Sequence, residues 1–178
     1  TDPAAGVVVA TIPDRLSRFL TAGDIDGDGH LDIVIVDNLK WDIRWFRNPG
    51  PEKISQAWQL NRVAQPKEVP GSYDVALGDL DGDGDLDVAA SSWRYGNRFD
   101  WFENVGRAGN GSRWVRHEVD RDIAETRTIA IADFNRDGWP DFYVANDAYE
   151  NNLWIGMLGA GLSRYNRERD DFEHFRHD

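Results

Sequence analysis

Several common features are missing from this sequence of 178 residues, and each absence excludes a class of protein. There is no cysteine, so neither a disulfide framework nor thiolate chemistry is available. No apolar run is long enough for a transmembrane helix, so we expect no insertion into a membrane. Basic residues are outnumbered, 20 against 32 acidic residues, and the net charge of −12 argues against nucleic acid as a partner.

Helical periodicity is also lacking, and the chain instead repeats a nine-residue acidic motif. The motif reads DIDGDGHLD at residues 24–32, DLDGDGDLD at residues 79–87 and, less regularly, DFNRDGWPD at residues 133–141. The first aspartates of successive copies are 55 and then 54 residues apart. An acidic loop at a nearly fixed period predicts a cation site in each copy and a tandem-repeat fold.

Side-chain oxygens stand at positions 1, 3, 5 and 9 of each motif, and the glycine at position 6 permits a sharp turn. Crowded carboxylates repel one another unless a cation offsets their charge, and Ca²⁺ accepts roughly six to eight oxygen ligands in flexible geometry. We therefore expect about three structural Ca²⁺ ions per chain, with the third site the weakest because it has one carboxylate fewer. The predicted side-chain ligands are Asp24, Asp26, Asp28, Asp32, Asp79, Asp81, Asp83, Asp87, Asp133, Asn135, Asp137 and Asp141. The predicted main-chain carbonyl ligands belong to His30, Asp85 and Trp139.

An EF-hand loop also begins with D-x-D-x-D-G, but it needs a glutamate at position 12 and a helix on each side. Position 12 is Ile35, Ala90 or Val144 in the three copies, and the residues that follow each motif are typical of strands. We therefore exclude an EF-hand. A metal-free acidic turn is the other alternative, and three copies in register argue against it.

Each motif lies between two predicted strands, and further short strands follow. The strands before the motifs are predicted at residues 17–23, 72–78 and 126–132, and those after them at 33–36, 88–90 and 142–145. A third strand is predicted at residues 45–48, 101–104 and 153–155, and a fourth begins at Trp58 and at Trp114. In the third copy we expect residues 156–161 to be flexible and residues 171–175 to supply a last strand.

Four short antiparallel strands in about 55 residues correspond to one blade of a β-propeller, so the predicted fold class is all-β with about three blades. Residues 1–178 form a single predicted propeller region, with repeat units at roughly 11–64, 65–119 and 120–178. The tryptophans that recur within the predicted third and fourth strands are expected in the core, and these are Trp45, Trp58, Trp101 and Trp114.

The loops, the strand before each loop and the Trp-Phe-x-Asn strand at residues 45–48 and 101–104 resemble the FG-GAP/VCBS repeat family. Members of this family are calcium-bearing propeller repeats that also occur in the heads of integrin α-subunits. The resemblance implies Ca²⁺ ligation by loop positions 1, 3, 5 and 9. The third copy departs from the pattern at Arg136 and at Trp139-Pro140.

Three blades cannot close a ring, because propellers typically have about four to eight blades. We expect the chain to be a segment of a larger propeller, since its repeats neither begin nor end cleanly. The alternative is that a homo-oligomer completes the ring with blades from a second chain.

A binding surface is predicted at the connections between the second and third strands, which lie at the opposite end of the strands from the acidic loops. These connections span residues 37–41, 91–97 and 146–150. An aromatic ring beside polar groups suits recognition of carbohydrate. The alternative, that these rings only pack between blades, stays open. The candidate ligand-binding residues are Trp41, Trp93, Arg94, Tyr95 and Tyr149.

The predicted function is a calcium-stabilised binding or adhesion module whose partner is carbohydrate or an extracellular protein, the latter in the manner of integrins. The alternative is part of a polysaccharide-active enzyme, because the resemblance extends to polysaccharide lyases and sugar dehydratases that carry this repeat. No catalytic residue is assigned, and a base would be sought first at Tyr95, Tyr149 or His117. Aspartate-rich loops load most readily outside the cytosol, so we expect an extracellular or cell-surface (secreted) protein. Residues 1–6 show no signal-peptide pattern and look like a processed or trimmed end.

Overall fold

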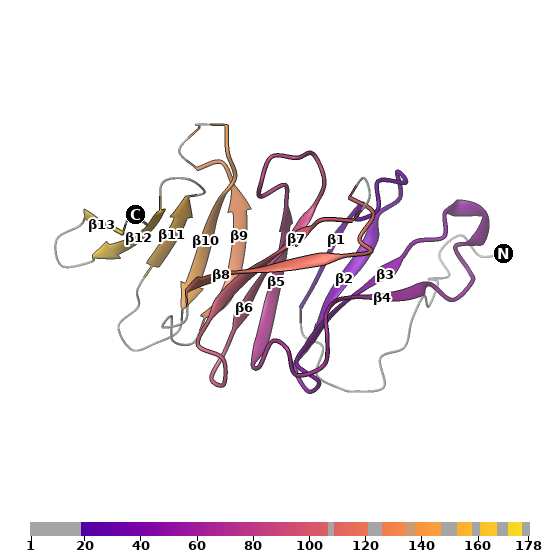
Figure 1. Ribbon diagram of the computed structural model, residues 1–178, viewed down its shortest axis with the longest axis horizontal. Coiled ribbons are helices and arrows are strands. Elements are labelled where there is room, and N and C mark those ends of the chain that lie inside the picture. Colours follow the sequence, from indigo (N-terminus) through magenta and orange to yellow (C-terminus); the bar gives the residue numbers. More distant parts are fainter. Residues whose placement is uncertain are drawn as a thin grey trace, which may run out of the picture.

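The computed structural model describes residues 19–106, 109–120, 126–134, 136, 138–146, 153–157, 161–166 and 171–175. These residues form an all-β protein of three antiparallel sheets that stand side by side (Figure 1). The first sheet contains β1 (Leu20–Gly23), β2 (Asp32–Asp37), β3 (Asp42–Arg47) and β4 (Gln59–Ala64), with a short 3-10 turn, η1 (Pro51–Lys53), before β4. The second sheet contains β5 (Ser72–Gly78), β6 (Asp87–Ser92), β7 (Phe99–Asn104) and β8 (Trp114–Asp120). The third sheet contains β9 (Thr126–Ala132), β10 (Asp141–Asn146), β11 (Leu153–Met157), β12 (Gly161–Asn166) and β13 (Asp171–Phe175).

Within each sheet every strand pairs with the next strand along the chain, so successive connections lie at opposite ends of the sheet. The three acidic motifs connect the first and second strands of the sheets, and we call them loop 1 (residues 24–32), loop 2 (79–87) and loop 3 (133–141). We call their side of the molecule the loop end. The connections between second and third strands lie at the other side, which we call the turn end. This arrangement agrees with the prediction that the two kinds of connection are separated.

Two hydrophobic cores lie between neighbouring sheets. The first, between the first and second sheets, includes Val34, Ile43 and Phe102. The second, between the second and third sheets, includes Phe99 and Phe142, whose rings meet edge to face with centroids 5.1 Å apart. Strands packed on both faces read as almost continuous apolar runs, which explains residues 33–36 and 88–90.

Two of the four tryptophans predicted for the core are fully buried there. Trp45 and Trp101 are 3% and 8% exposed. Trp114 is only partly buried at the edge of the first core. Trp58 is also only partly buried and precedes β4, and its Nε1–H donates to the carbonyl of Ile54 at 3.4 Å. The expectation of a core position was wrong for Trp58, which lies before β4 and is only partly buried, outside both core clusters.

The third sheet differs from the prediction of four strands and a flexible glycine-rich segment. Its described strands number five, in the order β13-β12-β11-β10-β9. Gly156 and Met157 pair with Leu162 and Gly161, so both ends of the segment predicted to be flexible belong to a β-hairpin. In the first two repeats a tryptophan marks the start of the fourth strand, but main-chain pairing needs no particular side chain. β12 has no such tryptophan and was therefore not predicted. The strand predicted at residues 171–175 is confirmed as β13.

Side chains also join one sheet to the next through main-chain groups. The buried carboxylate of Asp74 on β5 accepts a hydrogen bond from the amide of Ile129 on β9 at 3.2 Å, and burial raises the pKa of Asp74 although this bond opposes the rise. Thr126 Oγ1 accepts from the amide of Ser92 at 3.0 Å and donates to its carbonyl at 2.8 Å. The first strands of neighbouring sheets also contact each other, β1 with β5 and β5 with β9. The sheets are therefore held in a fixed row.

Candidate metal centre

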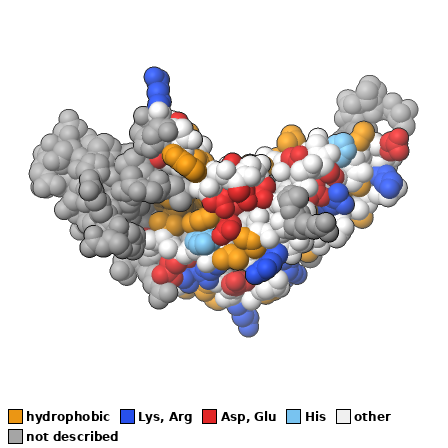
Figure 2. All heavy atoms as spheres, turned by 45° about the horizontal axis from the view of Figure 1, so that its top comes forward, with side chains coloured by type: hydrophobic (Ala, Val, Ile, Leu, Met, Phe, Trp, Pro, Cys, Tyr) orange, Lys and Arg blue, Asp and Glu red, His pale blue; other side chains and the backbone are white. Residues whose placement is uncertain are grey.

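Loops 1 and 2 each bring three carboxylates together. One oxygen from each of Asp24, Asp26 and Asp28 lies within 4.8 Å of the other two. In loop 2 the same holds for Asp79, Asp81 and Asp87. Figure 2, in which the loop end is turned forward, shows acidic side chains gathered on this face. Clusters of hard oxygen donors at this spacing have the chemistry that Ca²⁺ prefers.

The loops share a hydrogen bond between position 6 and position 1. The amide of Gly29 donates to Asp24 at 2.8 Å, and that of Gly84 donates to Asp79 at 3.1 Å. In loop 3 the amide of Gly138 donates to Asp133 at 3.0 Å. These glycines have φ angles of 86°, 97° and 94°, which only glycine adopts without strain. The turn therefore aims the first carboxylate into the loop.

The position-9 aspartates have a second task, which the sequence analysis did not anticipate. Asp32, Asp87 and Asp141 are buried, and each accepts a hydrogen bond from the position-2 amide of its own loop, at 3.1, 2.8 and 2.9 Å. The second oxygens of Asp32 and Asp87 accept from the amides of Asn48 and Asn104 at 2.7 and 2.8 Å. These asparagines end the Trp-Phe-x-Asn strands, so the repeated asparagine was the available signal. Position 9 thus closes the loop on the sheet through hydrogen bonds from main-chain amides.

The second loop is further anchored by the side chain of Asn104. Its Nδ2 donates to the carbonyls of Gly109 at 2.8 Å and of Ile25 at 3.1 Å, and its Oδ1 accepts from the amide of Gly111 at 2.9 Å. The residue is 1% exposed. One buried amide therefore connects the base of loop 2 to loop 1 and to the connection after β7.

Burial and mutual repulsion disfavour the charged form of several carboxylates in loops 1 and 2. Burial raises the pKa of Asp32 to about 6 and that of Asp87 to about 7, although main-chain hydrogen bonds oppose the rise. Burial, and then the charges of Asp83, Asp81 and Asp79, raise the pKa of Asp85 to about 6. A cation would stabilise the ionised forms and reverse these shifts. The residues present therefore fit a divalent cation.

The described residues of loop 3 include two left-handed positions that match those of loops 1 and 2, with a different side chain at one of them. Arg136 at position 4 adopts φ 63°, where loops 1 and 2 have Gly27 and Gly82 at 71° and 79°. The indole of Trp139 lies against loop 2, since a Cβ added to Gly82 would be 2.5 Å from Trp139 Cζ3. The predicted ligands Asn135 and Asp137 lie outside the described residues. The ligand assignment in loop 3 therefore stays a prediction.

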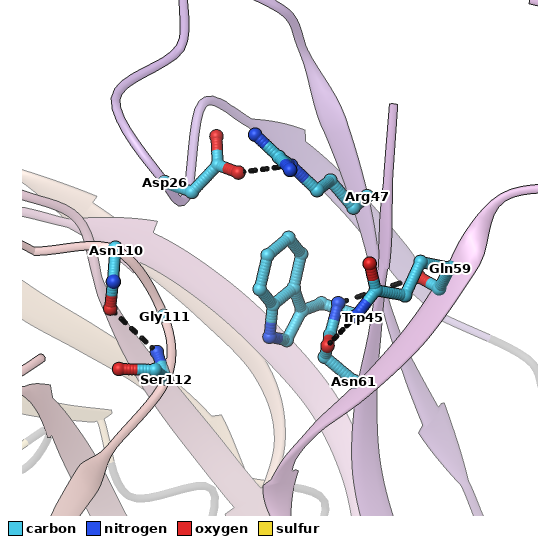
Figure 3. A pocket seen from close by; sticks show the side chains of 8 residues that line it. All are labelled: Asp26, Trp45, Arg47, Gln59, Asn61, Asn110, Gly111 and Ser112. Atoms are coloured by element: carbon cyan, nitrogen blue, oxygen red, sulfur yellow. Dashed lines mark hydrogen bonds and ion pairs between the residues drawn. The ribbon is translucent and has the colours of Figure 1, made fainter. Parts of the chain in front are cut away.

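The side chain of Arg47 contacts loop 1. The guanidinium of Arg47 pairs with Asp26 through Nε and with Asp28 through Nη2, the latter at 3.0 Å. A cavity of about 280 Å³ opens beside this pair, with Trp45 on one wall (Figure 3). The other residues that line it are Gln59, Asn61, Asn110, Gly111 and Ser112. The Nε1–H of Trp45 is buried without a hydrogen-bond partner.

At the turn end, four of the five candidate ligand-binding residues lie in described segments. The rings of Trp41 and Tyr95 meet across two sheets with centroids 5.9 Å apart. Trp93 lies beneath the guanidiniums of Arg94 and Arg127, 4.0 and 5.0 Å from its ring centroid. Tyr149 lies outside the described residues. Tyr95 is 75% exposed, so its ring is the most accessible of the group.

The sheets and loops together define a tandem β-repeat protein in which each sheet carries an acidic loop between its first two strands. A family model described as the FG-GAP-like repeat matches residues 24–90 and 79–144, which together exceed half of the chain. The chain belongs to this family, and the resemblance inferred from the motifs is confirmed. Both matches begin at position 1 of a loop. Comparison with curated proteins gave no significant match, and neither did comparison with solved structures.

Proposed function

We propose that this protein is a calcium-stabilised β-propeller module that binds carbohydrate at its turn end. Membership of the FG-GAP-like repeat family supports a propeller-type binding or adhesion module. The observation that carries the assignment of the turn end is the meeting of Trp41 and Tyr95, which are 54 residues apart in sequence. Both were selected from the sequence as ring-bearing residues of separate connections.

The propeller is supported by the way in which the sheets pack. Each of the first two sheets is a four-stranded antiparallel meander in chain order, as in a propeller blade. Contacts of β5 with both β1 and β9 suit strands that surround a common axis. The described sheets form an open row, so further blades would be needed to close a ring. Size measurement by light scattering at several concentrations would show whether a second chain supplies them.

Calcium is proposed as the structural ion of the loops. Asp24, Asp26 and Asp28 would hold it in loop 1, and Asp79, Asp81 and Asp87 in loop 2. The ion would offset the repulsion among the carboxylates and add its binding free energy to that of folding. Isothermal titration of the chelator-treated protein with Ca²⁺ tests this, and no heat of binding at millimolar Ca²⁺ would refute it.

Carbohydrate recognition is supported by the different positions of the aromatic residues at the turn end. The exposed ring of Tyr95 can cover the apolar face of a sugar, and Trp41 braces it from the side. Arg94 is exposed beside them and can donate hydrogen bonds to hydroxyl groups. The ring of Trp93 contacts the guanidiniums of Arg94 and Arg127, so we assign it to positioning Arg94.

The deciding experiment is electrophoresis in native gels cast with a panel of polysaccharides, in the presence of Ca²⁺. We expect one polymer to retard the protein and Tyr95→Ala to abolish the retardation. Phe134→Ala is the matched control, because Phe134 is an exposed aromatic residue on loop 3 at the other end. Equal retardation of the two variants would refute the assignment of the turn end. Retardation with depolymerisation would favour the enzyme, and failure with every polymer would favour adhesion to protein.

An extracellular location accompanies this proposal, because the loops require abundant Ca²⁺. Within the described ranges, no helix has the length and hydropathy needed to cross a membrane. Cell fractionation with an antibody against this chain tests the location.

A further inference from the structure

The residue opposite position 9 of each loop differs in charge from one sheet to the next. Continued by one residue, the pairing register places Arg47 of β3 opposite Asp32 and Glu103 of β7 opposite Asp87. The two residues therefore occupy equivalent places beside loops 1 and 2. The sequence pattern Trp-Phe-x-Asn treats this position as variable.

At loop 1 the cationic residue, Arg47, forms ion pairs with two of the proposed metal ligands. Arg47 pairs with both Asp26 and Asp28, at positions 3 and 5, and Figure 3 shows its side chain reaching across to Asp26. The side chain of Asp26 is only 7% exposed, so the pair is shielded on that side. Partial burial alone would lower the pKa of Arg47, but the charges of Asp26 and Asp28 raise it above its ordinary value. The guanidinium is therefore a fixed positive charge at the place that a cation would take.

At loop 2 the equivalent residue has the opposite charge. Burial raises the pKa of Asp81, and the negative charges of Asp83, Glu103 and Asp79 raise it further. Glu103 Oε2 lies 2.6 Å from His117 Nε2, and the His117 ring stacks on Trp101 with centroids 4.2 Å apart. The glutamate is thus held beside the loop and adds to its negative potential.

We propose that this position sets the order in which the loops take up calcium, so that loop 2 fills first and loop 1 fills only when Ca²⁺ displaces Arg47. The inference rests on the calcium binding proposed above. A divalent ion entering loop 1 must break two ion pairs, whereas an ion entering loop 2 gains attraction from Glu103. For unit charges a few ångströms from the ion, at a partly exposed site, this difference corresponds to about tenfold or more in affinity.

The third sheet provides the design of a neutral variant. Asp141 pairs with Met157, so methionine occupies this register position naturally. Arg47→Met removes the charge of loop 1 and keeps a long side chain, and Arg47→Lys keeps the charge. Lys67→Met is the matched control, since the exposed Lys67 lies in the connection between β4 and β5 at the turn end.

The experiment is a Ca²⁺ titration followed by ¹H–¹⁵N correlation spectra, which resolve the two loops. The amides of Gly29 and Gly84 donate to position 1 of loops 1 and 2, so each reports its own site. In the wild type we expect the Gly84 signal to reach its midpoint at about tenfold lower Ca²⁺ than the Gly29 signal. Arg47→Met should bring the Gly29 midpoint down to within about threefold of Gly84. Arg47→Lys and Lys67→Met should leave both midpoints in place.

A second variant guards against a folding artefact at loop 1. Glu103→Gln should raise the Gly84 midpoint several-fold and leave Gly29 unchanged. Equal midpoints in the wild type that Arg47→Met does not move would overturn the proposed order while leaving calcium binding intact. A shift at neither glycine would refute calcium binding itself, and the order would fall with it.

Discussion

The two ends of the sheets differ in how they make their tight turns. Among the described residues of the three loops, left-handed backbone is confined to glycines and the one substitute, Arg136. At the turn end the left-handed residues outside glycine are Trp41, Lys67, Arg94 and Asn97. Such a conformation costs about 1–2 kcal/mol for a residue with a Cβ. The loop end therefore places glycine at most of its left-handed positions, whereas the turn end has residues with larger side chains at such positions despite the strain.

The ends differ in charge compensation as well. At the turn end, the buried Asp42 pairs with Arg44 and Arg62, and Asp100 pairs with Arg98 and Arg116. At the loop end Arg47 pairs with Asp26 and Asp28, whereas Asp32 and Asp87 accept hydrogen bonds from main-chain amides and their burial raises their pKa values. Arginines therefore compensate Asp42 and Asp100 at the turn end and part of loop 1 at the loop end, and we expect a cation from solution to compensate loop 2. Stability should therefore respond to metal and pH through the loop end, and ligand binding should respond to mutations at the turn end.

Removing calcium should produce the largest effect. Two loops filled at about 100 times their Kd would contribute roughly 5 kcal/mol, which corresponds to a Tm lower by about 10–20 °C after chelation. Thermal melts with EGTA and with millimolar Ca²⁺ measure the difference. Tyr95→Ala should show the same difference, because the turn end does not hold the ion. A Tm that does not change with EGTA would contradict the proposed difference in metal dependence between the loop end and the turn end.

Position 9 and position 5 should respond differently to alanine. Asp87→Ala leaves the buried amides of Leu80 and Asn104 without an acceptor, so we expect a loss of about 3 kcal/mol, or roughly 6–12 °C in Tm, even in EGTA. Asp83→Ala should lower the Tm only when Ca²⁺ is present, because Asp83 is exposed and is a ligand predicted from the sequence, outside the cluster of Asp79, Asp81 and Asp87. Equal losses of Tm from both variants in EGTA would show that Asp87 does not stabilise the loop independently of the metal.

The pH dependence should invert with calcium. In the calcium-free protein the pKa of Asp87 is about 7 and that of Asp32 about 6, both above the ordinary value of 3.8. The folded state therefore binds these protons more tightly than the unfolded state, and its stability should fall as pH rises through 6 to 7. We expect the Tm in EGTA to be several degrees higher at pH 5.5 than at pH 8. With Ca²⁺ the stabilisation by the ion should shrink toward pH 5.5, because protons compete with it.

Asp87→Asn is the control for this pH effect. It removes the group that titrates near neutral pH, so the slope of Tm against pH in EGTA should flatten. An unchanged slope would place the proton uptake elsewhere in the chain.

The smallest change in stability should come from the turn end. Because Tyr95 is 75% exposed, Tyr95→Ala should shift the Tm by less than about 2 °C. The same variant should weaken carbohydrate binding about tenfold, since loss of a ring contact removes roughly 1 kcal/mol or more. Titration with the retarding polymer measures the affinity. A large loss of stability with unchanged affinity would reverse the roles that we assign to the two ends.

Local patterns predicted much of this fold because the repeat confirmed each strand in a second copy. β5 and β9 have the predicted bounds, and β13 was anticipated from residues 171–175. β12 was missed because its pairing with β11 is carried by the main chain. The contacts of Asp74 and Asn104 between sheets could not be predicted either, since they depend on how the sheets dock.

The candidate site was likewise predicted only in part from the sequence. Spacing indicated the aspartates of the loops, and Asp24, Asp26 and Asp28 do converge. The same spacing is silent about Arg47 and Glu103, because both stand at the variable position of a strand outside the motif. Only the pairing register brings them beside the loops. The meeting of Trp41 and Tyr95 likewise required the packing of two sheets.

The contact of Trp139 with Gly82 has an optical consequence. An indole that lies against a metal loop can absorb ultraviolet light and pass its excitation to a luminescent lanthanide bound there, and trivalent lanthanides use the same oxygen ligands as Ca²⁺. Terbium bound in loop 2 should therefore luminesce when tryptophan is excited, with Trp139 of the neighbouring repeat as the energy donor.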